Sequence, residues 1–370
     1  MSKQKKNGFT LVELLAVIVI LAVILVIAVP SIMSTIKESR KGAFASSAKL
    51  IASSAETAYI SNQTLGIEKT IECEDVSNYT EEDYASCKIK FVDGKAKVKL
   101  VGQGKFEGMA VCSGTKEEAE VVEECPVPVS FANDSWATIK AAVDEGDTGN
   151  YNVGDIKTVN LGTTLGTHTV RIANKSACPT GDNALASQSA CGFVIEFADI
   201  ISNHSMNTSA TNAGGWPASA MRTYVNGDIY NALPAELRDA IIDTKVVSGH
   251  GNGDTTGTLA NNNFGSTDKV YLLSTSEVWG TGLSYDTAGG ETITRQLDYY
   301  KNRNVTTSNY SISRKQNGGS YSYWWLRSAP SNRSNGFYNV YCDGGWSSSG
   351  GWYEPNAIDT CGVSPAFRLG

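Results

Sequence analysis

The stretch Gly8-Phe9-Thr10-Leu11-Val12-Glu13, followed by an unbroken apolar run from Leu14 to Val29, decides how this chain is organised. As a helix, residues 9–29 would rise about 31 Å, which is enough to cross the hydrocarbon layer of a membrane. Basic residues ahead of the run predict that the leader stays cytoplasmic and that the chain after Pro30 is exported. These residues are Lys3, Lys5 and Lys6.

Glu13 distinguishes this segment from an ordinary anchor, because a carboxylate beside a membrane-spanning helix is costly without a partner or a task. A secretory signal is cleaved after its apolar core. Here we expect processing before the core, so that the helix is retained. The alternative is a plain signal anchor on a monomeric membrane protein, in which Glu13 is incidental.

The basic leader, the glycine, the Phe-Thr-Leu-Val-Glu sequence and the apolar run closely resemble the prepilin signature of type IV pilins and pseudopilins. The resemblance implies cleavage between Gly8 and Phe9 by a membrane prepilin peptidase and methylation of the new amino terminus. It also implies that Glu13 pairs with the Phe9 amine of a neighbouring pilin subunit when the helices bundle. The protein would lie in the cell membrane before assembly and in an extracellular pilus on the cell surface afterwards.

Length and charge set limits on the exported part. A chain of 370 residues predicts two folded units behind the helix. The net charge of −7 argues against a nucleic-acid partner, which needs clustered Lys and Arg. The sequence holds none of the motifs HExxH, GxSxG or GxxxxGK[ST]. We therefore expect no catalytic residues, no metal and no cofactor.

The eight cysteines predict disulfides rather than zinc or thioredoxin chemistry, because none forms a CxxC motif and the chain is exported. Sequential pairing would close short loops, although sequence alone does not fix the connectivity. The pairs would be Cys73–Cys87, Cys112–Cys125, Cys178–Cys191 and Cys342–Cys361.

The first exported unit is expected to combine a helix with a small antiparallel sheet. Apolar residues at spacings of three and four predict that the helix continues to about Asn62. Residues 88–92 and 97–101 alternate in period two about Asp93-Gly94, which predicts a hairpin, and a third strand is expected at 105–112. Two prolines in Cys125-Pro126-Val127-Pro128 indicate a stiff linker.

The second unit is expected to be mixed α and β. A helix capped by Asp134 or Ser135 should run to Glu145. Further helices are expected at 218–233, 235–242 and 295–300. Strands are expected at 158–161, 167–173, 193–197, 270–274, 323–327, 337–341 and 366–369.

The tract at 329–361 has the composition of a binding surface. More than half of its residues are Ser, Asn, Tyr, Asp or Gly, and Trp346 and Trp352 add apolar contact area. Catalysis needs acids, bases or metals in a fixed geometry, whereas these residue types serve recognition. We therefore predict that the tract binds an unknown extracellular ligand, protein or glycan. The alternative is a turn-rich β segment without a ligand.

The flanks of this tract, WWLRS at 324–328 and GVSPAFRL at 362–369, resemble the terminal domain of variable proteins of diversity-generating retroelements. That family uses a C-type-lectin-like fold and scatters adenine-containing codons such as those for Asn. Candidate scattered positions are Ser331, Asn332, Arg333, Asn335, Tyr338, Asn339, Tyr341, Asp343, Ser347, Ser348, Ser349, Tyr353, Asn356 and Asp359. Cys342 and Cys361 could be products of the same scatter, so their disulfide stays open. Scaffold positions would be Trp324, Trp325, Leu326, Phe337, Val340, Trp346, Val363 and Phe367, and Trp346 is at the same time a predicted ligand-binding residue.

Together these expectations describe an α+β protein: a long N-terminal membrane and stalk helix with a small antiparallel, pilin-like sheet, then a C-type-lectin-like mixed α/β domain. The expected parts are a leader at 1–8, a transmembrane or filament helix at 9–30, a pilin-like unit at 31–125, a linker at 126–129 and a ligand-binding domain at 130–370. The expected function is a pilin-like subunit, minor or at the tip, for adhesion or ligand recognition. Alternatives are a fixed-specificity adhesin, a structural pseudopilin of a secretion or uptake system and, more remotely, an enzyme like those that generate formylglycine.

Overall fold

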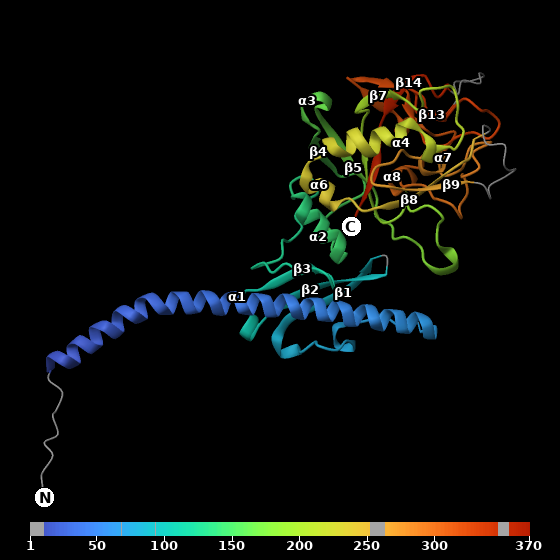
Figure 1. The fold of residues 1–370 in the computed structure, drawn as a ribbon. Helices are drawn as coiled ribbons and strands as arrows, with labels where there is room; N and C mark the ends of the chain where they lie inside the picture. Colours follow the sequence, from blue (N-terminus) through green and yellow to red (C-terminus); the bar gives the residue numbers. More distant parts are fainter. Residues whose placement is uncertain (1–10, 68, 93, 252–262, 347–354) are drawn as a thin grey trace, which may run out of the picture. The chain divides into compact units, whose positions relative to one another are not determined.

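A computed structural model describes residues 11–67, 69–92, 94–251, 263–346 and 355–370. The chain divides into two compact units, Met1–Pro126 and Val127–Gly370. The division falls within the expected proline-containing linker at 126–129. The order of elements is a long apolar helix, then a mixed α/β domain with several small sheets (Figure 1).

The first unit is built on helix α1 (Leu11–Leu65), which is one continuous helix through Pro30. Its N-terminal part projects beyond the sheet of this unit (Figure 1). Its C-terminal part packs on that sheet through small and apolar side chains, including Phe44, Ala48 and Ile51, which are fully buried. The helix expected from the periodicity of the sequence is therefore confirmed.

The sheet of this unit has the order β1-β2-β3, with β1 at Tyr84–Val92, β2 at Lys95–Gly102 and β3 at Ala110–Gly114. The β1–β2 hairpin is the expected one, and Ala96, Val98 and Leu100 point from β2 into the core. The third strand was expected from Lys105 and begins only at Ala110. The chain first forms a 3-10 turn at Gly104–Phe106, because Phe106 turns inward and packs in the core.

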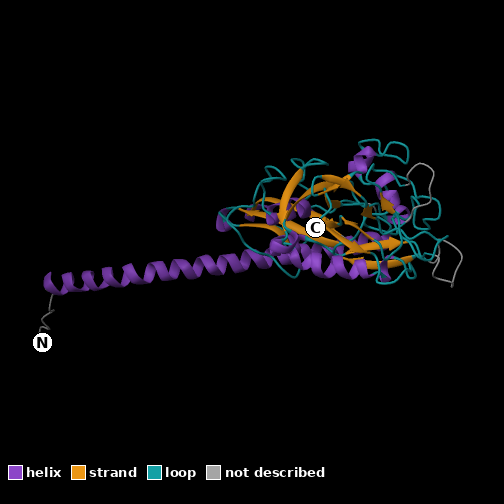
Figure 2. Ribbon diagram, turned by 90° about the horizontal axis from the view of Figure 1, so that it is seen from above, coloured by secondary structure: helices purple, strands orange, loops and turns teal. Residues whose placement is uncertain are grey.

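In the described part of the second unit, two sheets and two hairpins are joined by segments that are largely loop (Figure 2). One antiparallel sheet has the order β15-β6-β5-β4. Its strands are β4 (Ile156–Asn160), β5 (Thr167–Asn174), β6 (Phe193–Phe197) and β15 (Ala366–Leu369). All four were expected. Helix α2 (Trp136–Glu145) is capped by the Ser135 hydroxyl, as expected.

The second sheet has the order β13-β12-β14-β7, and its strands are very short. They are β7 (Ser202–Ser205), β12 (Trp324–Trp325), β13 (Asn339–Val340) and β14 (Thr360–Val363). Strand β12 pairs antiparallel with β13 and parallel with β14, so the segment before the tract lies beside both its middle and its C-terminal end. The hairpins are β8 (Thr244–Ser248) with β9 (Phe264–Asp268) and β10 (Lys315–Asn317) with β11 (Ser320–Ser322).

Three expectations in this unit need correction. The helix expected at 218–233 begins at Ala220 and contains a π-helical turn at Val225–Ile229. Within that turn the Asn226 side chain donates to both Arg222 O and Val270 O. Residues 270–274 form one isolated bridge, Tyr271 to Ala366, rather than a strand. The helix expected from Arg295 starts at Asp298. The helical segments are α3 (Gly162–Leu165), α4 (Ala220–Tyr224), a π turn (Val225–Ile229), α5 (Tyr230–Ala232), α6 (Ala235–Ala240), α7 (Thr275–Trp279) and α8 (Asp298–Lys301).

Candidate functional site

The apolar half of α1 is the first candidate site. Its window of highest mean hydropathy, 3.3, lies entirely outside the interior of the protein, and length and composition allow the helix to cross a membrane. Glu13 lies in the first turn of the helix. The expected cleavage point, Gly8 and Phe9, lies outside the described residues. An apolar face of this size needs lipid or other helices to cover it.

The second candidate site is the tract, and its flanks are anchored in the core. Trp324 and Trp325 are fully buried, and their indole groups donate to Ser313 O at 3.1 Å and His204 O at 2.8 Å. Seven of the eight expected scaffold residues are fully buried, whereas Trp346 is 39% exposed, so its expected scaffold role is corrected. The buried seven are Trp324, Trp325, Leu326, Phe337, Val340, Val363 and Phe367. Buried indoles need such partners, so the flanks have one defined position.

Arg327 fixes the N-terminal flank through a buried ion pair. Its guanidinium donates to both carboxylate oxygens of Glu277, at 2.6 and 2.5 Å, and to Leu272 O and Val247 O. Burial of Glu277 opposes its ionisation, but the Arg327 charge and hydrogen bonds lower the pKa of its carboxyl below the usual value. The pair is bidentate and fully enclosed, which is the geometry that a planar guanidinium favours.

A second ionic cluster holds the C-terminal flank. The buried Lys315 ammonium donates to Glu196 Oε2 at 2.7 Å and to Ser364 Oγ at 2.9 Å, and Ser364 belongs to the GVSPAFRL flank. Arg171 bonds the other oxygen of Glu196 at 2.9 Å. Burial lowers the pKa of Lys315 to about 8, and the negative charge of Glu196 opposes this. The hairpin β10–β11 is thereby tied to the end of the tract.

Between these anchors, the predicted ligand-binding residues separate into exposed and buried sets. Tyr338, Asn339 and Tyr341 are 2%, 4% and 5% exposed, so the expectation that they lie on the surface is corrected. The Tyr338 hydroxyl donates to Ser284 O inside the protein. The exposed or half-exposed residues are Ser331, Asn332, Arg333, Asn335, Asp343, Trp346, Asn356 and Asp359. Ser347, Ser348, Ser349, Trp352 and Tyr353 lie outside the described residues.

We call one set of residues the Tyr–Trp surface: Tyr310, Arg314, Tyr321 and Tyr323, which precede the tract, and Trp346, which belongs to it. Tyr321, Tyr323 and Trp346 are 47%, 42% and 39% exposed. The Arg314 guanidinium stacks on Tyr321 at 4.4 Å. The turn before Trp346 packs closely against Tyr310. Gly344 has φ +93°, and a Cβ there would lie 2.2 Å from Tyr310 O, so only glycine fits at this position.

Sequence reasoning placed the surface in 331–361 and missed Tyr321 and Tyr323. The alternation Ser320-Tyr321-Ser322-Tyr323 was an available signal, since period two places both rings on one face of a strand. These rings contribute large contact area with little side-chain entropy to lose, as the tract composition also suggests. The exposed set therefore extends from the tract to the hairpin that precedes it.

The cysteines agree with the expectation in three pairs of four. Disulfides join Cys73 with Cys87, Cys112 with Cys125 and Cys178 with Cys191. Cys342 and Cys361 are free thiols, so the fourth pairing is wrong. Burial raises the pKa of Cys361 to about 11, whereas Cys342 is exposed and lies at the edge of the Tyr–Trp surface.

Comparisons with known proteins identify two regions. The family model described as "Prokaryotic N-terminal methylation motif" matches residues 3–29, and the model described as "Domain of unknown function (DUF6273)" matches residues 193–370. No curated protein and no solved structure matches. The second match begins at the first residue of β6 and contains the whole tract.

The methylation motif is the type IV prepilin signature, so the N-terminus of this protein is pilin-like. The motif implies processing by prepilin peptidase and assembly with other pilins. Together with the apolar helix, it fits a membrane-anchored precursor that is then assembled into a surface pilus.

Proposed function

We propose that this protein is a type IV pilin-like subunit that presents its C-terminal unit at the cell surface to bind an extracellular ligand. The observation that carries the proposal is the methylation motif at 3–29, which leads into a helix whose most apolar segment is not buried within the protein. If every subunit of the filament were this protein, the large unit Val127–Gly370 would cause steric crowding between neighbouring copies. We therefore propose a minor or tip subunit.

The proposed binding site is the Tyr–Trp surface with the exposed residues of the tract. Two buried ionic clusters hold the flanks, while aromatic and small polar side chains face outward between them. This arrangement suits recognition of a protein or glycan. Its described residues include no set of acids and bases aligned for catalysis, so we propose binding rather than enzymatic activity. Resemblance of the flanks supports a C-type-lectin-like fold.

Diversification of the tract by a retroelement is part of this proposal. Its support is the resemblance of the flanks and the residue mix between them. DNA beside the gene tests it: a near-copy of the tract that differs where the copy has adenine, next to a reverse-transcriptase gene, would establish it. A locus without them would leave a fixed-specificity adhesin.

Mass spectrometry of surface-sheared filaments tests the pilin role. We expect the mature chain to start at Phe9 with a methylated amino group. Glu13→Gln should remain in the membrane and be lost from the sheared fraction, because the charge proposed to pair with a neighbouring subunit is gone. Glu38→Gln, in the exposed part of the same helix, is the control and should assemble. A retained Met1 in filaments would contradict the proposal.

Ligand binding is tested with full-length protein on a printed glycan array and on immobilised fibronectin, collagen and laminin. Tyr321→Ala with Trp346→Ala should weaken any binding by at least tenfold, since each loss of an exposed aromatic contact is expected to cost about 1–2 kcal/mol. Ile156→Ala, exposed on β4, is the control. Unchanged binding in the double variant would place the site elsewhere, and a structural pseudopilin would bind none of these probes.

A further inference from the structure

A cavity of about 610 Å³ lies within the second unit, and none of its lining residues belongs to the Tyr–Trp surface. Two segments line it, residues 176–185 and residues 276–301. Its volume falls within the range of small-molecule sites. No function assigned above uses it.

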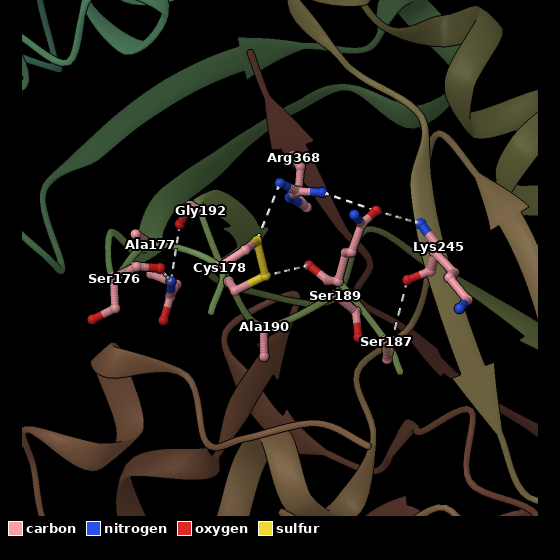
Figure 3. The surroundings of a disulfide bond; sticks show 12 residues. Ser176, Ala177, Cys178, Ser187, Ser189, Ala190, Gly192, Lys245 and Arg368 are labelled. Carbon is pink, nitrogen blue, oxygen red and sulfur yellow. Dashed lines mark hydrogen bonds between the residues drawn. A yellow bond between two sulfur atoms is a disulfide. The ribbon is translucent and has the colours of Figure 1, made fainter. Parts of the chain in front are cut away.

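The first wall is held rigidly by covalent and polar contacts. The Cys178–Cys191 disulfide closes the loop that forms this wall, and Arg368 Nη2 lies 3.5 Å from Cys178 Sγ (Figure 3). Arg295 reaches across from the second wall and donates to Ser176 O at 2.6 Å and Ala177 O at 2.9 Å. The two walls are therefore joined before any ligand enters, which lowers the entropic cost of binding.

The second wall presents backbone to the cavity. At Gly282, a Cβ would lie 2.5 Å from Gly289 Cα, so the two glycines pack against each other without side chains. Gly280, with φ +79°, ends α7 in the left-handed conformation. Close backbone packing of this kind leaves carbonyl and amide groups, rather than bulky side chains, along this wall.

The polar groups of the cavity are balanced in charge. Arg295 and Lys301 oppose Glu291 and Asp298, and Asp298 already accepts hydrogen bonds from Ser176 N and Oγ. Ser276 lines the same cavity and is 4% exposed, yet its buried hydroxyl has no hydrogen-bond partner among the described residues. Buried hydroxyl groups usually form a hydrogen bond, so this hydroxyl is available to donate to or accept from a polar group in the cavity.

We propose that this cavity binds a short, uncharged, hydroxyl-rich ligand, a mono- or disaccharide, with Ser276 Oγ bonded to one of its hydroxyls. Balanced charge disfavours an anion or a cation, because either would leave an opposing side chain unmatched. Hydroxyls both donate and accept, and so they can satisfy Ser276 and the exposed Glu291 and Lys301 together. The proposal does not depend on the pilin role or on binding at the Tyr–Trp surface.

Thermal unfolding of the full-length protein, followed by tryptophan fluorescence in lauryldimethylamine oxide, tests the proposal, since this detergent carries no sugar. The probes are glucose, galactose, mannose, N-acetylglucosamine, lactose and maltose, with acetate as the anionic and glycine as the zwitterionic comparison. At least one saccharide should raise the melting temperature saturably, because a ligand of the native state stabilises it by mass action. A rise with acetate or glycine alone, or with no probe, overturns the proposal.

Two variants examine the site itself. Ser276→Ala should bind the active saccharide about tenfold more weakly, because one hydrogen bond is lost, while the free protein melts at the same or a higher temperature. At Gly290, a Cβ meets no atom within 4 Å, so Gly290→Leu can start its side chain in open space beside the cavity and should abolish binding by occupying it. Gly265→Leu on β9, also unobstructed, is the control. Wild-type affinity in either cavity variant overturns the assignment.

Discussion

Replacing Arg327 with methionine tests whether a buried ion pair holds the flank of the tract. Methionine keeps much of the side-chain volume but removes the charge, so Glu277 would remain in the interior without its cation. Breaking one partner of a buried pair costs about 3–5 kcal/mol. Leu272 O and Val247 O also lose their Arg327 donors, so we expect a loss near the upper end.

The double variant R327M/E277L should recover most of that loss. Replacing a buried ion pair by apolar groups of similar size is often close to neutral, because no uncompensated charge is left. The hydroxyls of Ser189 and Thr294, which donate to Glu277, would lose their acceptor. We therefore expect the double variant to remain about 1–2 kcal/mol less stable than wild type.

The contribution of Glu277 to the free energy of unfolding should change with pH in opposite directions in wild type and in R327M. In wild type, the pKa of Glu277 lies below its usual 4.5, so this carboxylate stabilises the fold above that pH and the stabilisation is lost below it. In R327M the same carboxyl is buried without a cation, which raises its pKa, and protonation then favours the folded state. The deficit of R327M against wild type should shrink from pH 7 to pH 5.

Urea unfolding followed by tryptophan fluorescence measures this unit alone, because all seven tryptophans lie within Val127–Gly370. A loss of several kcal/mol should lower the urea midpoint by about 1 M or more. Arg303→Met, at an exposed arginine, is the control and should stay within about 0.5 kcal/mol of wild type. An unchanged midpoint in R327M, or a double variant as unstable as the single one, would refute the reasoning.

Three further predictions concern the cysteines, Lys315 and Tyr338. Maleimide labelling should modify Cys342 quickly and Cys361 only after unfolding, because Cys361 is partly buried and its pKa is raised to about 11. A total other than two reactive thiols in the unfolded protein would contradict the three disulfides. The pKa of Lys315 is lowered to about 8 in the folded protein, so above that pH the unfolded chain binds more protons and the free energy of unfolding should rise with pH. Lys315→Met should remove this rise. If calorimetry at pH 8 and 9.5 gives wild type and variant the same change in stability, the prediction is refuted. Tyr338→Ala should cost about 3–5 kcal/mol in urea unfolding because the side chain is buried, whereas Asn332→Ala should cost less than about 0.5 kcal/mol.

The first unit could be predicted well from the sequence because its signals are local. Apolar spacing marks α1, and period two about Asp93-Gly94 marks the β1–β2 hairpin. The short loops closed by Cys73–Cys87 and Cys112–Cys125 also needed no knowledge of distant contacts. Only the third strand was misplaced, because Phe106 satisfies the apolar pattern of a strand while its backbone forms a turn.

The second unit was harder because its sheets depend on pairings between distant segments. Strand β7, Ser202–Ser205, has no apolar alternation and is a strand only because β14 lies beside it. Residues 270–274 have the composition of a strand but do not form one. Leu272 O accepts a hydrogen bond from the Arg327 side chain, and Tyr271 forms only an isolated bridge with Ala366. The prediction that Tyr338 is exposed was wrong because it relied on the polarity of the residue. A tyrosine whose hydroxyl has a partner within the protein, as that of Tyr338 does, cannot be told from an exposed one by sequence.

The burial pattern within the tract restricts how any diversification could act. Tyr338, Asn339 and Tyr341 share the interior with the scaffold, so their replacement would be limited by packing as well as by ligand. Asn332, Asp343 and Trp346 are exposed and have no such limit. Because Arg327 and Ser364 fix the two flanks independently of these side chains, exposed positions could vary while the fold stays constant. A diversified tract and a stable fold are therefore compatible in this protein only if most accepted variation falls on the exposed set.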